Sequence, residues 1–93
     1  MRYIDVSWLH KSPLEPVRLI SELDVAGWER RKLEFFADGR VGFACSTRAT
    51  DGTALGTAPI PPLAEINAQS ELEGIEIDAK YFEELWYEYV DAG

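Results

Sequence analysis

His10 is the only histidine in the chain, and Asp5, Ser7 and Ser12 lie close to it in sequence. A histidine acts as a general base when a nucleophile lies within hydrogen-bond reach and an acid orients its ring. These neighbours match no known local signature of a catalytic site. We therefore expect His10 to lie at the end of a strand beside a loop, and we expect no catalytic residue around it.

Cys45 is the only cysteine, so it cannot form an intramolecular disulfide. A nucleophilic pair with His10 would require their two strands to be adjacent. In the alternating run 41–47, Cys45 shares a side with Val41 and Phe43, which is typical of a small buried apolar residue. We expect a core position for Cys45, and a single cysteine suits a protein of the reducing cytoplasm.

Acidic residues are dense between residues 71 and 78, but their spacing is not that of a calcium loop, in which alternating acids are followed by a glycine. The chain has no cluster of Cys and His residues for zinc. The segment from Gly52 to Gly56 has no lysine that would cradle a phosphate. The sequence therefore predicts no metal and no cofactor.

The 93 residues carry 17 acids and 9 bases, a formal net charge of −8, with 46% hydrophobic and 28% charged residues. This mixture is typical of one globular domain, here spanning residues 1–93. No apolar run approaches the ~20 residues of a membrane span, and residues 1–5 show no apolar start of a secretory signal. Because a nucleic-acid binder normally carries a basic surface, we expect no direct contact with nucleic acid. We expect a cytoplasmic protein without membrane contact.

Four runs with a period of two predict strands, and they cover residues 2–10, 17–24, 28–36 and 41–47. Asp38-Gly39 between the last two runs is a strong hairpin signal. In the first run, Ile4 and Val6 share one side of the strand and Tyr3 lies on the other. The short connections between these runs favour an antiparallel meander.

Residues 46–62 are rich in Ser, Thr, Gly and Pro, which predicts a long loop, and long loops in compact domains are often functional. Two prolines at its end suit the start of a short helix over residues 63–69. Residues 75–77 form a brief extended link in this interpretation. Asp78 then suits the N-cap of a final helix that runs to about residue 91.

The final helix has an apolar arc that carries Tyr81, Phe82, Leu85, Trp86, Tyr89 and Val90. Its opposite arc is polar and carries Lys80, Glu83, Glu84, Tyr87, Glu88 and Asp91. We expect the apolar arc to close the core of the sheet. The predicted fold is α+β, a four-stranded antiparallel meander sheet with a short helix and a C-terminal amphipathic helix packed on one face.

Charge is divided unevenly along the chain, because residues 49–93 hold ten acids and one base, whereas residues 1–48 have a balance of +1. Glu88 and Asp91 lie at the negative end of the helix dipole, where each exposed acid costs about 0.3–1 kcal/mol. Tyr87 lies among carboxylates, as an interface anchor would. A solvated helix face, with the tyrosine flat on its own helix, explains the same pattern without a partner. The candidate partner-binding residues are Glu83, Glu84, Tyr87, Glu88 and Asp91.

A second surface is suggested by Trp28, Arg30, Lys32 and Phe36, which share one side of the third run. Aromatic residues interleaved with bases stack on single-stranded nucleic acid, but the net charge opposes that function here. Cover by the long loop, a second interface, or a two-fold contact between two copies of the chain are the alternatives.

Three segments of the chain resemble those of a known family. The first is Tyr3-Ile4-Asp5-Val6-Ser7-Trp8, the second is Arg31-Lys32-Leu33-Glu34-Phe35-Phe36 with Asp38-Gly39-Arg40 after it, and the third is Phe82-Glu83-Glu84-Leu85-Trp86. The sequence resembles a family of short bacterial proteins known only as a domain of unknown function. The resemblance covers nearly the whole chain. It implies a bacterial, single-domain, intracellular protein, and it supplies no catalytic residues.

The sequence favours a non-enzymatic binding module over an enzyme. The most specific hypothesis is an immunity or antitoxin-like protein that inhibits a basic partner, such as a toxin with nuclease activity, by direct contact. Acidic charge speeds such encounters, and residues 50–57 would form a flanking contact. The competing hypotheses are a small enzyme or ligand-binding domain with a site between the sheet and the 46–62 loop near His10, and a self-associating structural protein.

Overall fold

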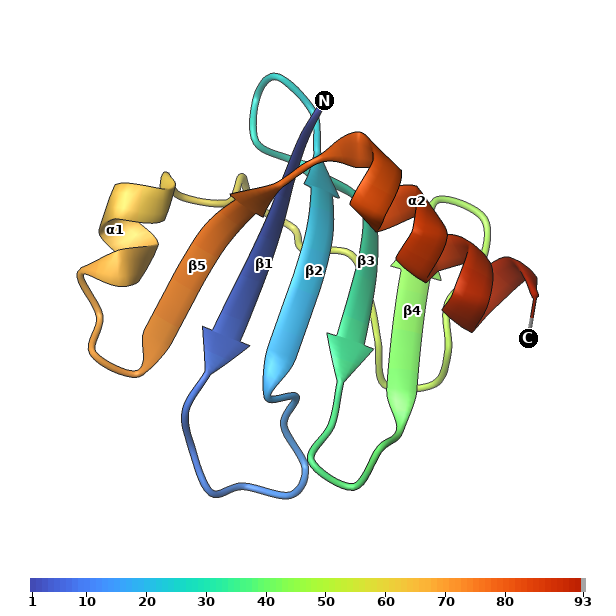
Figure 1. The fold of residues 1–93 in the computed structure, drawn as a ribbon, viewed down its shortest axis with the longest axis horizontal. Helices are drawn as coiled ribbons and strands as arrows, with labels where there is room; N and C mark the ends of the chain where they lie inside the picture. The colour runs from blue at the N-terminus through green and yellow to red at the C-terminus, as the bar shows by residue number, and fades with distance from the viewer. Residues whose placement is uncertain (93) are drawn as a thin grey trace.

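The first half of the chain, in which apolar and polar residues alternate, forms four antiparallel strands. These strands lie side by side in the order of the sequence (Figure 1). The computed structural model describes residues 1–92. The strands are β1 (Arg2–Trp8), β2 (Arg18–Leu23), β3 (Glu29–Phe35) and β4 (Val41–Cys45). The predicted hairpin between β3 and β4 is confirmed, because Gly39 has a φ of 94° and its N–H donates to Phe36 O at 3.0 Å.

A fifth strand, β5 (Leu72–Ile77), extends the sheet where the sequence predicted a brief extended link. β5 pairs antiparallel with β1, with Ile75 opposite Asp5, so the strand order is β4-β3-β2-β1-β5. The predicted α+β class and antiparallel arrangement are confirmed, with one strand more than expected. The alternation of apolar and polar residues in β5 is not visible in the sequence. Gly74 occupies its buried position, where a strand usually carries a large apolar side chain.

One face of the sheet is crossed diagonally by α2 (Ala79–Trp86) and its continuation η1 (Tyr87–Asp91) (Figure 1). Phe82 is fully buried, and Trp86 and Val90 follow it at four-residue steps along the buried side. These side chains pack against Ile20 and Leu33 from the centre of the sheet. The predicted apolar arc therefore closes this half of the core.

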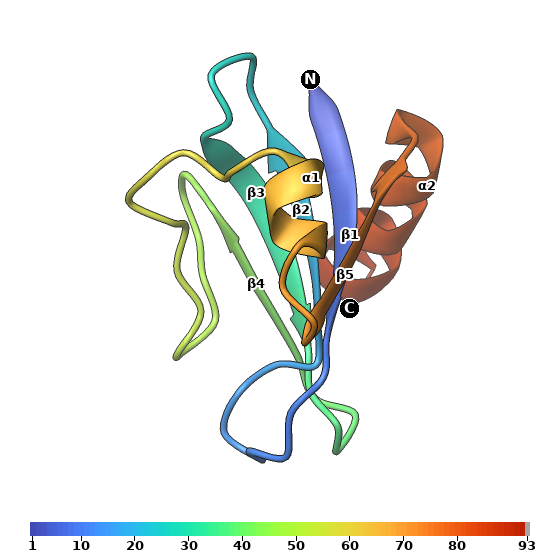
Figure 2. The same ribbon diagram turned by 90° about the vertical axis from the view of Figure 1, so that its left-hand side faces the viewer.

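The opposite face of the sheet is covered by α1 (Leu63–Asn67) and by the loop of residues 46–62 (Figure 2). Ile66 of α1 packs with Ile4 and Val6 of β1. The two helices thus lie on opposite faces rather than on one. Both sides of the alternating pattern in β1 are buried as a result, since Tyr3 packs under α2 and Ile4 under α1.

We expect Phe82→Ala to lower the free energy of unfolding by about 3–5 kcal/mol, because it removes a fully buried ring from the centre of the core. Urea unfolding followed by tryptophan fluorescence measures this change. Tyr87→Ala, on the exposed side of the same helix, is the matched control and should shift the stability by about 0.5 kcal/mol or less. Equal losses in the two variants would contradict the buried role of Phe82.

Candidate functional site

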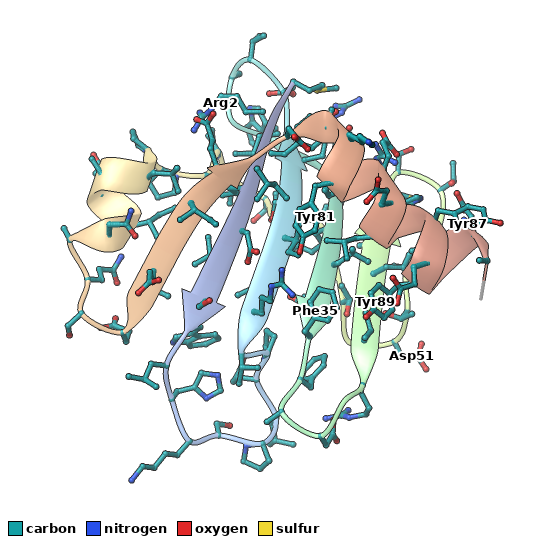
Figure 3. The ribbon with its side chains drawn as sticks, in the orientation of Figure 1. Arg2, Phe35, Asp51, Tyr81, Tyr87 and Tyr89 are labelled. Atoms are coloured by element: carbon teal, nitrogen blue, oxygen red, sulfur yellow. The ribbon has the colours of Figure 1, made fainter. Side chains whose placement is uncertain are left out.

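The C-terminal helix is fixed at its start and along its inward side. Asp78 caps the helix as predicted, because its Oδ1 accepts a hydrogen bond from Tyr81 N at 2.8 Å. Figure 3 shows Tyr81 and Tyr89 directed over the sheet, and Tyr87 directed away from it at the far end of the helix. The rings of Tyr89 and Phe35 meet edge-on with centroids 5.2 Å apart. This inward packing determines which residues face outward.

Two of the five predicted partner-binding residues have ion-pair partners within the chain. Glu83 Oε2 accepts a hydrogen bond from Arg31 Nη2 at 2.6 Å. Asp91 Oδ1 lies 3.6 Å from Arg48 Nη2. Both carboxylates remain exposed, but their charge is partly neutralised, which makes them weaker candidates for contact with a basic partner.

Glu84, Tyr87 and Glu88 form the remaining outward group, which we call the helix outer face. All three are exposed, and Tyr87 is exposed to 64%. Within residues 1–92, neither carboxylate has a Lys or Arg at ion-pair distance. The two glutamates are four residues apart, so their like charges repel along one side of the helix.

Arg31 is the cation that joins the sheet to α2. Its guanidinium donates to Glu22 from β2 at 2.8 Å and to Glu83 from α2 at 2.6 Å. It also stacks over the rings of Phe82 and Trp86, with centroid distances of 4.8 and 5.1 Å. The hydrogen bonds from Arg31 hold the pKa of the Glu22 carboxyl below its ordinary value of 4.5. Glu83 is therefore a structural contact of α2 with the sheet.

The ten acids of residues 49–93 do not form the single patch that the hypothesis assumed. Glu65 lies on α1, and Glu73 and Glu76 lie on β5. These elements occupy the opposite end of the sheet from η1 (Figure 1). The acidic charge of this half of the chain is therefore spread over several places, among them the β5 end of the molecule, the helix outer face and, at Asp51, the long loop.

His10 uses both ring nitrogens within the connection between β1 and β2. Its Nε2 donates to Pro16 O at 2.7 Å, and its Nδ1 accepts a hydrogen bond from Ser12 N at 3.0 Å. The ring also meets Trp8 edge-on, with centroids 4.4 Å apart. β1 ends at Trp8, so His10 lies just past the end of the strand and beside the loop, close to the position that the sequence predicted. Its Nδ1, the nitrogen that a general base would use, already accepts the hydrogen bond from Ser12 N.

Cys45 lies half-buried on β4 and packs against the core under α2, on the side that the sequence predicted. Strands β2 and β3 separate β4 from β1, the strand that precedes His10, which excludes a Cys45–His10 pair. Hydrogen bonding with the backbone of Thr47 lowers the pKa of the thiol. With no histidine beside it, the thiol has no base to form a catalytic dyad.

The basic run on β3 is divided between the two faces of the sheet. Arg31 lies under α2, whereas Lys32 lies on the opposite face, where the long loop covers it and leaves it 8% exposed. Arg30 is exposed, with its Nη1 4.0 Å from Asp24 Oδ2. Because the loop buries Lys32, the surface of Trp28, Arg30, Lys32 and Phe36 is not continuous and cannot stack on nucleic acid along its length. Burial of Lys32 agrees with the alternative in which the long loop covers this side of the strand.

A network of charged and polar side chains is buried beneath the long loop. Lys32 Nζ lies 3.0 Å from Glu29 Oε1 and 3.8 Å from Glu34 Oε2. Ser21 Oγ donates to Glu29 Oε2 at 3.0 Å, and Thr53 Oγ1 donates to Glu34 Oε1 at 3.1 Å. We call these five residues the Glu29 network. It holds the loop in place, because buried polar groups need such partners.

Sequence reasoning missed this network because charged residues on one side of a strand normally face solvent. The available signal was the position of Lys32 and Glu34 opposite the apolar Leu33 and Phe35 in the same strand, in a chain that also contains a long polar loop. A buried sheet face covered by that loop would turn those charges inward. The sequence does not show which loop residue reaches them.

A groove of about 230 Å³ lies on the α1 face, between the sheet and the end of the long loop. Its walls are mostly aliphatic, and Ser21 and Glu29 reach it from the Glu29 network. His10 is not among its lining residues. The groove is therefore where the alternative hypothesis placed a ligand site, between sheet and loop, but it lacks the histidine which that hypothesis put beside it.

Each edge strand of the sheet has hydrogen bonds from a residue outside the sheet. At β5, Asn67 Oδ1 accepts from Gly74 N at 2.6 Å, and Asn67 Nδ2 donates to Gly74 O at 2.9 Å. At β4, Thr50 Oγ1 accepts from Phe43 N at 3.0 Å, and Thr50 N donates to Phe43 O at 2.9 Å. These contacts use backbone groups that a second copy would need for strand pairing.

The family model described as Domain of unknown function (DUF6881) matches residues 2–91, and the chain belongs to this family. No curated protein matches the chain, and no solved structure does. The match confirms the resemblance to an uncharacterised family. It assigns no activity to any residue.

The helices and the acidic side chains of residues 1–92 bear on membrane and metal binding. None of the helices there is both long enough and apolar enough to cross a membrane. In the same part of the chain, no three His, Cys, Asp or Glu side chains gather in a way that could hold a metal ion.

We expect Glu22→Gln to weaken the pH dependence of stability on the acid side. The lowered pKa of Glu22 means that its ionised form stabilises the fold above its ordinary value of 4.5, and that this contribution is lost as the pH falls through the lower folded value. The variant should be about 1–2 kcal/mol less stable at neutral pH. Its stability should then fall less than that of the parent between about pH 5 and pH 3.

Urea unfolding at several pH values measures both effects. Glu84→Gln is the matched control, because it removes a carboxylate from the same molecule without breaking an ion pair in residues 1–92. Its acid profile should follow that of the parent. If Glu22→Gln and the parent lose stability equally with falling pH, the Arg31 contact does not contribute in this way.

Proposed function

We propose that this member of the DUF6881 family is a non-enzymatic binding module that contacts a basic protein partner through the helix outer face. The observation that carries the proposal is Tyr87, exposed to 64% and flanked by Glu84 and Glu88. A tyrosine gives a large rigid contact surface at low cost in side-chain entropy, and tyrosines are enriched among residues that dominate binding energy. The two carboxylates beside it would select a positively charged partner.

The distribution of cations supports this assignment. Seven of the nine Lys and Arg residues pair with acids elsewhere in the chain, and they are Arg2, Arg18, Arg30, Arg31, Lys32, Arg40 and Arg48. Glu84 and Glu88 have no such partner within residues 1–92. Their negative charge therefore remains available for steering an encounter with a basic surface.

The last turn of the helix breaks local rules that usually favour stability. It is a π-helix, in which Ala92 N donates to Tyr87 O at 2.7 Å, five residues back. π-turns are rare and frequently lie at functional sites. This turn also contains no basic residue to oppose the helix dipole. Such departures without a structural gain are expected at surfaces kept for function.

The most specific form of the proposal is an immunity or antitoxin-like inhibitor of a basic toxin such as a nuclease. A nuclease site that receives phosphate has the charge to receive Glu84 and Glu88 in its place. We place the protein in the cytoplasm, where a single cysteine with no disulfide partner is stable. Glu83 and Asp91 would lie at the rim of the contact, already engaged by Arg31 and Arg48.

Affinity capture from a lysate of the source organism, at low and at moderate salt, tests the proposal. We expect the parent to retain a basic protein and Tyr87→Ala to lose at least about tenfold in affinity, as a hot-spot residue does. Glu84→Lys/Glu88→Lys should abolish retention. Each variant is first shown to unfold at the same urea concentration as the parent.

The matched control is Glu65→Lys/Glu71→Lys, which changes the net charge equally at the α1 and β5 end of the molecule. This control should retain the partner nearly as well as the parent. Equal loss in both double variants would mean that net charge alone drives the capture. That result, or full retention by Tyr87→Ala, would overturn the assignment of the helix outer face.

A further inference from the structure

The groove on the α1 face combines aliphatic walls with one buried carboxylate. Leu19 and Val6 rise from the sheet, Ile66 comes from α1, and Ile60 comes from the end of the long loop. The Glu29 side chain is 4% exposed, and it lines the groove together with Ser21. A pocket with apolar walls and a few convergent polar groups is the usual form of a small-molecule site.

Glu29 is held in a fixed position by two hydrogen-bond donors and one ammonium group. Its Oε1 accepts from Gly56 N at 2.6 Å and lies 3.0 Å from Lys32 Nζ, while its Oε2 accepts from Ser21 Oγ at 3.0 Å. A carboxylate has about four acceptor positions. Oε2 has one hydrogen-bond partner within residues 1–92, so it has capacity for a second donor, and both Glu29 and Ser21 line the groove.

The Glu29 network contains more negative than positive charge. Its two carboxylates, Glu29 and Glu34, share one ammonium group, that of Lys32, and the three side chains are 4%, 12% and 10% exposed. Burying a charge is costly unless an opposite charge compensates it. A second cation placed at Glu29 Oε2 would balance the network.

We propose that this groove binds a small primary amine with an apolar body. The ammonium group would donate to Glu29 Oε2 and to Ser21 Oγ, and the body would lie against Leu19, Val6 and Ile66. The groove measures about 230 Å³, and an apolar cavity of roughly 150 Å³ holds a benzene ring. The volume therefore suits a body of one ring, or a short branched chain, with its amine.

The groove exists before a ligand enters, because the same network that would receive the amine also fixes its loop wall. Gly56 N binds Glu29, and Ile60 N donates to Gly27 O at 2.8 Å. A preformed site loses little entropy on binding. α1, which lines the groove, and α2 lie on opposite faces of the sheet (Figure 2), so this inference does not depend on the proposed partner.

Titration with phenethylamine, followed by the backbone amide signals of the isotope-labelled protein, tests the inference. We expect saturable binding with a Kd of about 1 mM or tighter, and the largest shifts at Leu19, Ser21 and Glu29. Propylbenzene, in which a methyl group replaces the ammonium, should bind at least about tenfold more weakly. The anion 3-phenylpropanoate should not bind, because it would add a third negative charge to the network.

Glu29→Gln should weaken phenethylamine at least about tenfold, since it removes the charge but keeps the size of the side chain. Glu34→Gln is the matched control, because it removes the same charge from the network at a residue that does not line the groove, and it should weaken the amine less. Leu19→Trp fills the groove and removes no charge or hydrogen-bonding group of the Glu29 network, although Leu19 lies opposite Glu34 across β2 and β3. It should abolish binding, which gives a second test if Glu29→Gln disturbs the loop.

Three results would overturn the inference. They are the absence of saturable binding of phenethylamine to the folded parent, equal binding of propylbenzene, and full binding by Leu19→Trp. Loss of the amine site would leave partner capture by the helix outer face unaffected, so failures of the two proposals are distinguishable.

Discussion

A single five-stranded sheet has two faces, and a chain of 93 residues has to bury both of them. The α2 face is covered by a long amphipathic helix. The large aromatic side chains of this helix bury enough apolar area to form a core there. The opposite face has only α1, which spans five residues, and this helix covers only part of it. α1 comes close because Gly74 lacks a side chain, and a Cβ built there would lie 2.8 Å from Leu63 Cδ2. The remainder of that face is left to a loop.

A loop that covers a sheet buries some of its own polar groups, and these groups need hydrogen-bond partners from the sheet. The Glu29 network supplies them, and within residues 1–92 no buried side-chain nitrogen or oxygen lacks a partner. Charged residues on this face of β3 are therefore a consequence of covering it with Thr and Gly rather than with a second long helix. The groove arises at the junction, where the loop ends at Ile60 and α1 begins. A ligand site here would use a gap that the short helix cannot fill.

The sequence predicted those strands and helices whose hydrophobic pattern and end signals lie within their own residues. The four strands of the first half alternate, and α2 has a cap at Asp78 and two clean arcs, so their existence did not depend on knowing their neighbours. β5 was missed because Gly74 stands at its central buried position. The Glu29 network was missed because a buried polar face and a solvated one have the same alternation. Glu83 was counted as a free charge because its partner Arg31 lies 52 residues earlier, and no local pattern joins them.

Pairing within the chain also changes what the net charge of −8 means. Seven cations neutralise acids locally, so the field of the molecule comes from the acids without partners. Two separated groups of these acids are those at the β5 end and those on the helix outer face, and Tyr87 lies in the second group. Negative charge would therefore guide a basic protein to the β5 end or to the helix outer face. Tyr87, by filling a pocket of the partner, would hold that protein at the helix outer face. Because the sheet separates this face from the groove, the protein could hold a partner on α2 and a small amine beneath its loop at the same time.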